Sequence, residues 1–564
     1  MANRCLSRLS VAAGDAIALF LQPYSPRPIN SAITSGCLLC NTRRSIHTTV
    51  ARKAIAEATA SDAGVKPFDE IPGPKPLPIV GNIWRFLPYV GEYYGRDSRD
   101  LTLHMYEKYG PIVKLVGIPG KPALMYVFRP EDVEVVFRNE GQWPIRGGMA
   151  TMSYYRNEMR KEYFQGVVGV LIQNGPKWLE SRSRVNPAMM QPRTSMRYIP
   201  PISSVAQEFV DRMRAIKDQN DEMPPDFMNE LFKWALESIA YVALDTRLGC
   251  LRENLPQDSE GQKMIDAVGD FFDCLFDLEM GLSIWKYYST PSWKRFVRAL
   301  DIFLEISTKY VDAAYERAQA QKQMDSSSKG EPSVLERLLE RASPKEAALM
   351  AQEMIFGGVD TSSYTMASAI YCLSKNQDKQ ELLYQELKKF LPRKDDVIKE
   401  EFLEDMKYLR GCLKEVFRVA SPFSGNARVT AKDTVIGNYK VPAGTFVIMP
   451  TLITYTSEEF FPLSKRFVPE RWLKSRPTAE TTGNKEDFDS TTTKKPPPFG
   501  LLPFGFGPRS CVGRRFAEME LYILLIKIFR NFRVEYNHGE IRYEHKVLSM
   551  PKDPLRFKIS ERKE

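Results

Sequence analysis

The stretch that most constrains the fold is "SPKEAALMAQEMIFGGVDTSSYTMASAIYCL", which extends from Ser343 to Leu373. It is apolar on most of its faces for about thirty residues, and a helix of this kind has to be surrounded by other elements. Ser343 fits the N-cap, Pro344 fits the first helical position, and Glu346 completes a capping box. The sequence therefore predicts a long helix that crosses the interior of a large domain.

Helical patterns dominate the rest of the chain as well, from about Pro130 to Ala420. Strand-like runs are short: "IVKLVGI" and "ALMYVF" precede this region, and "TVIGNYKVPAGTFVIM" follows it. There is no internal repeat. We expect a mainly α fold, a single large helical domain over residues 83–564 with a small β-rich subdomain. Within it, Ser475 to Pro498 is predicted to form a polar surface loop.

The N-terminal segment differs in composition from the body. Up to Lys53 it holds seven Lys or Arg residues and one acid, Asp15, and therefore +6 of the formal net charge of +9. An Arg-rich, Ser-rich, acid-poor segment is typical of a mitochondrial transit peptide, which we place at residues 1–55; a disordered basic tail is the alternative. A Pro-rich linker is predicted at residues 56–82. The remaining body is only mildly basic, which gives no reason to expect nucleic-acid binding.

One of the eight cysteines stands in unusual surroundings, "LPFGFGPRSCVGRR". Four others lie mostly in apolar stretches and are predicted to be buried: Cys250, Cys274, Cys372 and Cys412. Cys511 follows a glycine-rich turn and precedes a helical pattern, and a helix N-terminus favours the thiolate that binds metals. Glycines there allow a flat ligand to approach the backbone, and Arg509 can reach an anionic group on it. A haem with an axial thiolate satisfies these features; a glycine-rich turn with an incidental cysteine is the alternative.

The motif around this cysteine resembles that of the cytochrome P450 haem-thiolate monooxygenases. Phe504, Gly507, Arg509, Cys511 and Gly513 fill the pattern F-x-x-G-x-R-x-C-x-G, and the resemblance covers about residues 70 to 560. It implies haem b as the cofactor with Cys511 as the ligand to its iron. It also implies the reaction RH + O2 + 2 electrons + 2 protons → ROH + H2O.

The long helix carries a second motif of this family, "GGVDTSS". The resemblance implies that Thr361 offers a hydroxyl to the reacting oxygen and that Asp360 feeds the proton chain. Ser362 stands where threonine is usual and keeps a hydroxyl. The alternative is a packing notch of small residues, with Thr361 bonded back to its own helix.

Three further positions match residues that bind the haem carboxylates in the family. Trp178 and Arg182 in "KWLESR" fill W-x-x-x-R, and Arg428 lies in "NARVT". With Arg509, these arginines would neutralise two carboxylates that could not stay charged and buried alone. A surface arginine and a core tryptophan are the alternatives. A separate triad, Glu415, Arg418 and Arg471, is implied to be structural and to fix the region around the cysteine loop.

No dinucleotide or flavin fingerprint is present, so electrons have to come from another protein. Arg410 and Lys414 form one basic stripe on a helix, and Arg514 and Arg515 follow the cysteine. This pattern and "GRRFAEME" resemble the mitochondrial animal members of the family, and most nearly those of arthropods. The resemblance implies docking of a mitochondrial 2Fe-2S ferredoxin, itself reduced by ferredoxin reductase. A solvated charged face is the alternative.

The expected substrate is a hydrophobic small molecule, steroid-like or foreign to the organism. Family topology places its contacts near Phe356, "SPFSGN", residues 147–155 and "KVLSMP". The segment "DLEMGLSIWKYYSTPSWKRF" mixes Trp285, Tyr287, Tyr288 and Trp293 with lysines. It suits shallow membrane insertion, on the matrix face of the inner mitochondrial membrane; a packed loop between helices is the alternative.

Two other functions remain open from the residues alone. A haem-thiolate isomerase or dehydratase would use peroxides without activating dioxygen, and such relatives typically lack the helix threonine that Thr361 supplies. A haem protein without catalytic activity, acting as a sensor or carrier, would need neither Asp360 and Thr361 nor a basic docking surface.

Overall fold

A computed structural model describes residues 64–118, 120–253, 255–256, 258–281, 283–323, 331–473 and 496–563. By its internal contacts the chain divides into two units, Met1–Gly64 and Val65–Glu564. The elements described below all belong to the second unit. The predicted transit peptide and most of the loop predicted at Ser475 to Pro498 lie outside the described residues. Residues of the predicted linker take part in the second unit: the Lys66 amide donates to the Asn438 carbonyl, and Asn82 is fully buried.

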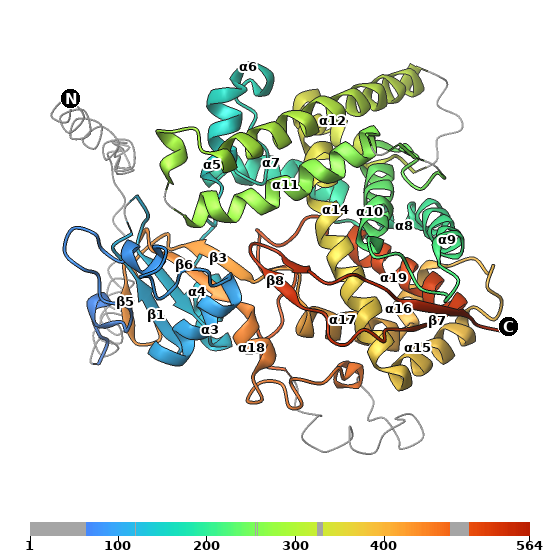
Figure 1. The fold of residues 1–564 in the computed structure, drawn as a ribbon. Coiled ribbons are helices and arrows are strands. Elements are labelled where there is room, and N and C mark those ends of the chain that lie inside the picture. The colour runs from blue at the N-terminus through green and yellow to red at the C-terminus, as the bar shows by residue number, and fades with distance from the viewer. Residues whose placement is uncertain are drawn as a thin grey trace, which may run out of the picture. The chain divides into compact units, whose positions relative to one another are not determined.

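Helices form most of this unit, as predicted (Figure 1). Before the central helix they are α3 (Ser98–Tyr109), α4 (Pro130–Arg138), α5 (Ala150–Tyr154), α6 (Lys161–Phe164), α7 (Gly175–Met189), α8 (Pro192–Met196), α9 (Ile199–Ile216), α10 (Phe227–Leu244), α11 (Glu260–Met280), α12 (Pro291–Gln323) and α13 (Val334–Leu339). From the central helix on they are α14 (Pro344–Lys375), α15 (Gln377–Phe390), α16 (Glu400–Asp405), α17 (Lys407–Val419), α18 (Thr451–Thr456) and α19 (Arg514–Asn531). Single turns of other helix types are η1 (Phe68–Glu70), η2 (Ile83–Phe86), η3 (Tyr155–Met159), η4 (Ser283–Lys286) and η6 (Pro469–Trp472).

The long helix α14 begins where the sequence predicts. The Ser343 side chain accepts a hydrogen bond from the Glu346 amide, and the Glu346 carboxylate accepts one from the Ser343 amide. Pro344 occupies the first turn, and most residues between Ala347 and Ser374 are buried. Because α10, α11, α12, α17 and α19 all pack against it, α14 is the axis of the helical region (Figure 1).

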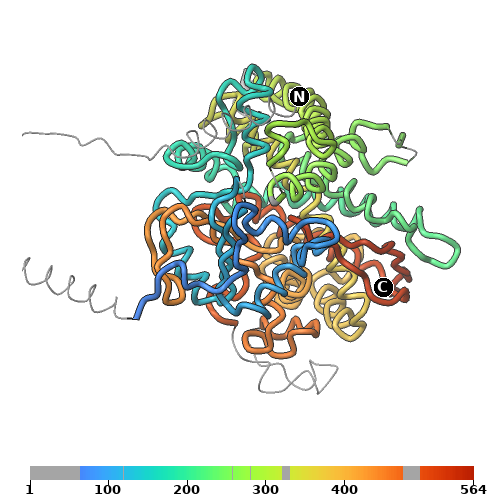
Figure 2. The backbone as a smooth tube through the Cα atoms, turned by 60° about the vertical axis from the view of Figure 1, so that its left-hand side comes forward, coloured from blue at the N-terminus to red at the C-terminus, as the bar shows by residue number. Residues whose placement is uncertain are grey.

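The β-rich part is small, as predicted, and centres on a four-stranded sheet with the order β1-β2-β6-β3. Its strands are β1 (Ile112–Leu115), β2 (Leu124–Val127), β3 (Gly425–Val429) and β6 (Phe446–Pro450). The other strands form three pairs: β4 (Thr434–Ile436) with β5 (Tyr439–Val441), β7 (Phe532–Glu535) with β10 (Lys558–Glu561), and β8 (Tyr543–His545) with β9 (Ser549–Pro551). Strand β2 is parallel to β6, so segments about 320 residues apart along the chain meet in one sheet (Figure 2).

The segment predicted to insert into a membrane has both buried and exposed aromatic residues. Trp285 and Trp293 are buried and stack with ring centroids 4.7 Å apart, so the tryptophans pack between helices. Tyr287 and Tyr288 are exposed. Within the described part of the chain, none of the helices has the length and apolar character needed to traverse a bilayer.

Candidate active site

The cysteine loop is held in place by its own backbone. The Cys511 amide donates to the Phe504 carbonyl at 2.9 Å, and the Ser510 amide donates to the Gly507 carbonyl at 3.0 Å. Gly505 and Gly507 have φ values of 70° and 73°, a conformation that favours glycine. A Cβ at Gly507 would also collide with the Glu140 carboxylate. These two glycines are therefore required by the loop itself, and α19 starts directly after Gly513.

Cys511 is the exposed cysteine among the five that the structure describes, and the four predicted to be buried are buried. Burial among the surrounding groups nevertheless raises the pKa of its thiol, and the Gly513 amide, Arg182 and Arg146 offset this effect only in part. The helix start thus favours the thiolate as expected, but it does not outweigh desolvation. A sulfur that is accessible and yet poorly hydrated is suited to coordination, because a bound metal removes the thiol proton.

Four arginines gather around this loop: Arg146, Arg182, Arg428 and Arg509. The Arg182 guanidinium donates to the Ser510 carbonyl at 2.8 Å, and that of Arg146 donates to the Arg509 carbonyl at 3.1 Å. Burial and mutual repulsion lower the pKa of Arg509 to about 9 and that of Arg146 to about 10. The cluster is therefore short of negative charge, and a ligand with two carboxylates would stabilise it.

The predicted carboxylate-binding residues have partners within the protein as well. Arg509 lies over the ring of the buried Trp178, 3.9 Å from its centre, and its Nε donates to the Pro144 carbonyl. The Nε of Arg428 donates to Glu140 at 2.6 Å. The Nε of Arg182 has no hydrogen-bond partner within the described chain, and it remains available to a ligand. These observations fit the carboxylates of a haem.

Sequence reasoning missed three members of this cluster: Glu140, Arg146 and Asn174. Glu140 is buried beside Arg428, and the Asn174 side-chain oxygen accepts from Arg509 at 2.7 Å and from the Arg146 amide at 2.9 Å. All three precede or lie within irregular segments, where no periodicity predicts which residues they contact. The only sequence feature that pointed to this cluster was the presence of an acid and a base, Glu140 and Arg146, in "NEGQWPIR", where no helix pattern explains them.

Asp360 and Thr361 lie on α14. Thr361 Oγ1 donates to the Gly357 carbonyl at 2.8 Å, which is the back-bonded arrangement considered as an alternative. Asp360 is 1% exposed, and burial together with the charge of Asp273 raises its pKa to about 7; Tyr364 offsets this only partly. At neutral pH this carboxyl can therefore both release and accept a proton.

The structure brings the predicted triad together. Glu415 bonds Arg418 at 2.7 Å and Arg471 at 3.1 Å, and all three side chains are at most 2% exposed. Glu415 also accepts from the Val468 amide and from the Trp472 indole. Since Arg418 donates to the carbonyls of Tyr455, Ser464 and Arg466, the triad ties α17 to the segment that precedes the cysteine loop.

The four basic residues predicted to dock an electron donor are all exposed: Arg410, Lys414, Arg514 and Arg515. Burial raises the pKa of Tyr522, and the charges of Arg410 and Arg514 both offset part of that rise, so the α17 and α19 sites lie near one another. Arg514 pairs with Glu518 at 3.2 Å, and Arg515 donates to the Met190 carbonyl at 2.5 Å. Arg514 and Arg515 nevertheless remain exposed to solvent.

Comparisons with known proteins agree with this arrangement. Residues 71–559 match the model of the cytochrome P450 family. "Probable cytochrome P450 49a1" of Drosophila melanogaster is 40% identical over 520 residues, which cover 92% of this chain and 87% of the relative. "Probable cytochrome P450 12a5, mitochondrial" of the same organism is 40% identical, covering 88% of this chain and 91% of the relative. "Probable cytochrome P450 301a1, mitochondrial", also from this fly, is 38% identical over 88% of this chain and 87% of the relative.

Solved structures share the fold. The structure described as "Crystal structure of cytochrome P450DA heme domain" superposes with a TM-score of 0.67 at 19% identity, covering 88% of this chain and 98% of that chain.

Proposed function

Because the chain belongs to the cytochrome P450 family and is a haem-thiolate monooxygenase, we propose that it oxidises a hydrophobic small molecule with electrons from a mitochondrial ferredoxin. The observation that carries this proposal is the buried arginine cluster around the exposed sulfur of Cys511. Cys511 would hold the iron. Trp178, Arg182, Arg428 and Arg509, as predicted, would hold the carboxylates, with Arg146 beside them. When bound, the haem activates dioxygen, so that one oxygen atom enters the substrate and the other leaves as water.

Protons for this reaction would come through α14. Asp360 is a buried acid whose pKa of about 7 allows it to hold or release a proton near neutral pH. Thr361, the next residue, presents a hydroxyl that can rotate from the Gly357 carbonyl toward a reacting group. This pair supports oxygen activation over the two alternatives, since an isomerase or a sensor has no use for a proton supply.

The electron donor would bind at the exposed basic residues of α17 and α19. Complementary charge speeds encounter between proteins, and the cysteine loop lies immediately before α19. The mitochondrial labels of two relatives and the basic N-terminal segment both support a matrix location. We propose a transit peptide at 1–55, a linker at 56–82 whose C-terminal part packs on the catalytic domain, and a catalytic domain at 83–564.

The substrate would lie against an apolar surface. Phe356 of α14 contacts the rings of Phe271, Phe272 and Phe303, with centroids 4.4 to 5.8 Å apart. This aromatic cluster favours a steroid-like molecule or a hydrophobic foreign compound. Exposed Ile284, Tyr287 and Tyr288 would rest on the inner membrane, peripherally, and would bring the protein to dissolved apolar substrates.

The decisive experiment is a substrate screen on the purified holoprotein. A bound substrate should shift the haem from low to high spin, and a mitochondrial ferredoxin with its reductase should then yield oxygenated product. Product that forms from peroxides alone, without donor or dioxygen, would favour the isomerase alternative. A haem spectrum that no apolar compound changes, with no turnover, would favour a carrier or sensor.

A further inference from the structure

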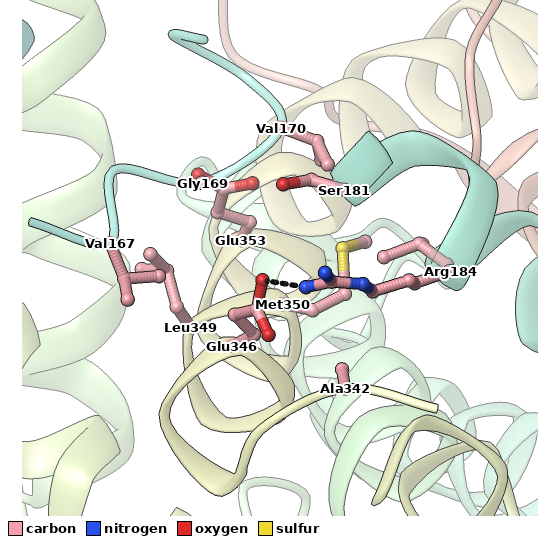
Figure 3. A pocket seen from close by; sticks show the side chains of 11 residues that line it. Val167, Gly169, Val170, Ser181, Arg184, Ala342, Glu346, Leu349, Met350 and Glu353 are labelled. Carbon is pink, nitrogen blue, oxygen red and sulfur yellow. Dashed lines mark hydrogen bonds and ion pairs between the residues drawn. The ribbon is translucent and has the colours of Figure 1, made fainter. Parts of the chain in front are cut away.

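Two small cavities lie on either side of one buried ion pair, formed by Arg156 and Glu353. The outer cavity is bounded by α7 and the first turns of α14, and Arg184 and Glu346 pair across it at 2.7 Å (Figure 3). The inner cavity is lined by Arg156, Gln352 and Phe356 among others. Each holds about 20 Å³, room for roughly one water molecule. Leu349 and Glu353 line both cavities and so form part of the wall between them.

The chain around the ion pair is shaped to hold it. The Arg156 guanidinium donates to Glu353 at 2.6 Å and to the Val168 carbonyl at 2.6 Å, and both charged side chains are 6% exposed. Arg156 lies in the π-helical turn η3, a conformation often found at functional sites. Gly169 has a φ of 80°, and a Cβ there would collide with the Glu353 carboxylate. A glycine is therefore required for the loop to pass so close to Glu353.

A line of residues on one face of α14 leads from Glu353 to Thr361, the threonine proposed to assist oxygen activation. Glu353, Gly357 and Thr361 are spaced by four residues and lie on one face of the helix. Although α14 is buried over most of its length, Gly357 is exposed, and a Cβ built there would meet nothing within 4 Å. Eight residues of helix rise about 12 Å, a distance that three or four hydrogen-bonded waters would span.

We propose that Glu353 positions and exchanges protons with water that enters beside Arg184 and Glu346 and passes along this line to Thr361. This inference rests on the proposed monooxygenase function, which consumes two protons for each substrate oxidised. In each transfer Glu353 gives a proton to the next water toward Thr361 and regains one from water in the outer cavity, so no net charge accumulates. Arg156 holds the carboxylate between the two cavities and thereby controls the passage.

The burial of Glu353 supports its proposed role in proton exchange. Removal from solvent raises the pKa of Glu353, and Arg156 and the amides of Leu171 and Val170 offset this only in part. A carboxylate kept at raised proton affinity in a water-accessible place is suited to proton exchange. The outer end is open to solvent, since the side chains of Arg184 and Glu346 are 36% and 23% exposed.

The first test is Glu353→Gln in the haem-loaded enzyme with ferredoxin, reductase and a substrate found by the spin-shift screen. The amide keeps the size of the side chain but cannot exchange a proton. Product per electron should fall by about tenfold, with hydrogen peroxide formed instead, and the solvent deuterium isotope effect on product formation should rise. Glu353→Asp should restore part of the yield. Glu230→Gln is the matched control, because Glu230 is a buried carboxylate on α10 paired with Arg212 and Lys233, outside both cavities.

The second test blocks the passage and leaves the ion pair intact. Ala342 lines the outer cavity (Figure 3), and Ala342→Phe should reduce its volume. Hydroxyl-radical footprinting without turnover should then show less labelling of Met350 in the outer cavity and of Phe356 in the inner one. The isotope effect should rise as it does in Glu353→Gln. This variant decides the question even if Glu353→Gln does not fold.

Unchanged isotope effects and footprints in haem-loaded variants would overturn the proposal and leave the ion pair as a support for the loop. Failure of the proposed monooxygenase function would look different. The unmodified protein would then give no dioxygen-dependent product, whatever the variants did.

Discussion

At the scale of single residues, the most unusual feature is positive charge held out of water around one thiol. Arg509, Arg146 and Arg182 all have lowered pKa values, with burial as the largest cause in each. Glu140 is the carboxylate that the structure places among them, bonded to Arg428. This arrangement suits a ligand of opposite charge. Replacing a single side chain in it should therefore change ligand binding or stability more than replacing a surface residue would.

Replacing Cys511 with serine should abolish the strongly red-shifted Soret band of the reduced carbon monoxide complex. The serine oxygen is a harder donor and holds its proton far more strongly than a thiol, so it does not replace the thiolate as a ligand. Cys274→Ser, at a buried cysteine of α11, is the control and should keep the band. If the Cys511→Ser spectrum retained the band, another residue would be the iron ligand.

Asp360 should make the protein less stable as pH rises toward and through neutrality. Its folded-state pKa of about 7 lies above the ordinary value of 3.8, so the folded chain holds a proton that the unfolded chain has released. The stabilising effect is complete below pH 3.8 and is lost as pH rises through about 7. Between pH 5 and 8.5 the loss is about 2–3 kcal/mol, and Asp360→Asn should remove it. Urea midpoints of both proteins at these two pH values test this; parallel changes in both would contradict it.

At the scale of elements, prediction succeeded where local chemistry decides the structure. Ser343 and Glu346 cap α14 because a capping box is complete within four residues, and the buried face follows from apolar periodicity. The cluster of Glu140, Arg146 and Asn174 could not be predicted in this way, since its members belong to loops whose neighbours are some 30 to 360 residues away. Likewise, the residues alone did not show that Trp285 stacks on Trp293 and so packs between helices.

Glu415→Gln should prevent accumulation of folded, haem-loaded protein. The amide would leave the buried guanidinium groups of Arg418 and Arg471 without a carboxylate, a change that costs about 3–5 kcal/mol. Trp472→Phe removes one hydrogen bond to the same carboxylate and should cost only about 1 kcal/mol. The haem-to-protein ratio after purification and the urea midpoint of haem absorbance measure both effects. Equal stability of the two variants would show that the triad contributes little.

At the scale of the whole molecule, function depends on surfaces as well as on the buried site. The basic residues of α17 and α19 form an exposed surface beside the cysteine loop, whereas the apolar cluster at Phe356 lies on α14 among α11 and α12. The electron delivery and substrate binding that we propose would thus use different elements, and a change at one should leave the other intact.

Reversing the charges of Arg410 and Lys414 to glutamate should slow reduction by a mitochondrial ferredoxin by tenfold or more at low salt, and by less at high salt. Steering by surface charge weakens because the Debye length is about 10 Å at 0.1 M salt. Lys294 and Arg298 have the same spacing and exposure on α12, so their reversal is the matched control. Stopped-flow reduction measures the rate, and the carbon monoxide spectrum confirms folding. Equal rates for both double variants would assign docking elsewhere.

The arginine cluster has a consequence for the life of the protein in the cell. A chain that folds without its cofactor has to confine several like charges in one place. Haem binding relieves that repulsion and lowers the free energy of the native state alone. Chains that find no haem spend more time partly open, which is the state that proteases degrade. In the proposed mitochondrial location, the amount of this enzyme should therefore follow the haem supply as well as synthesis of the chain.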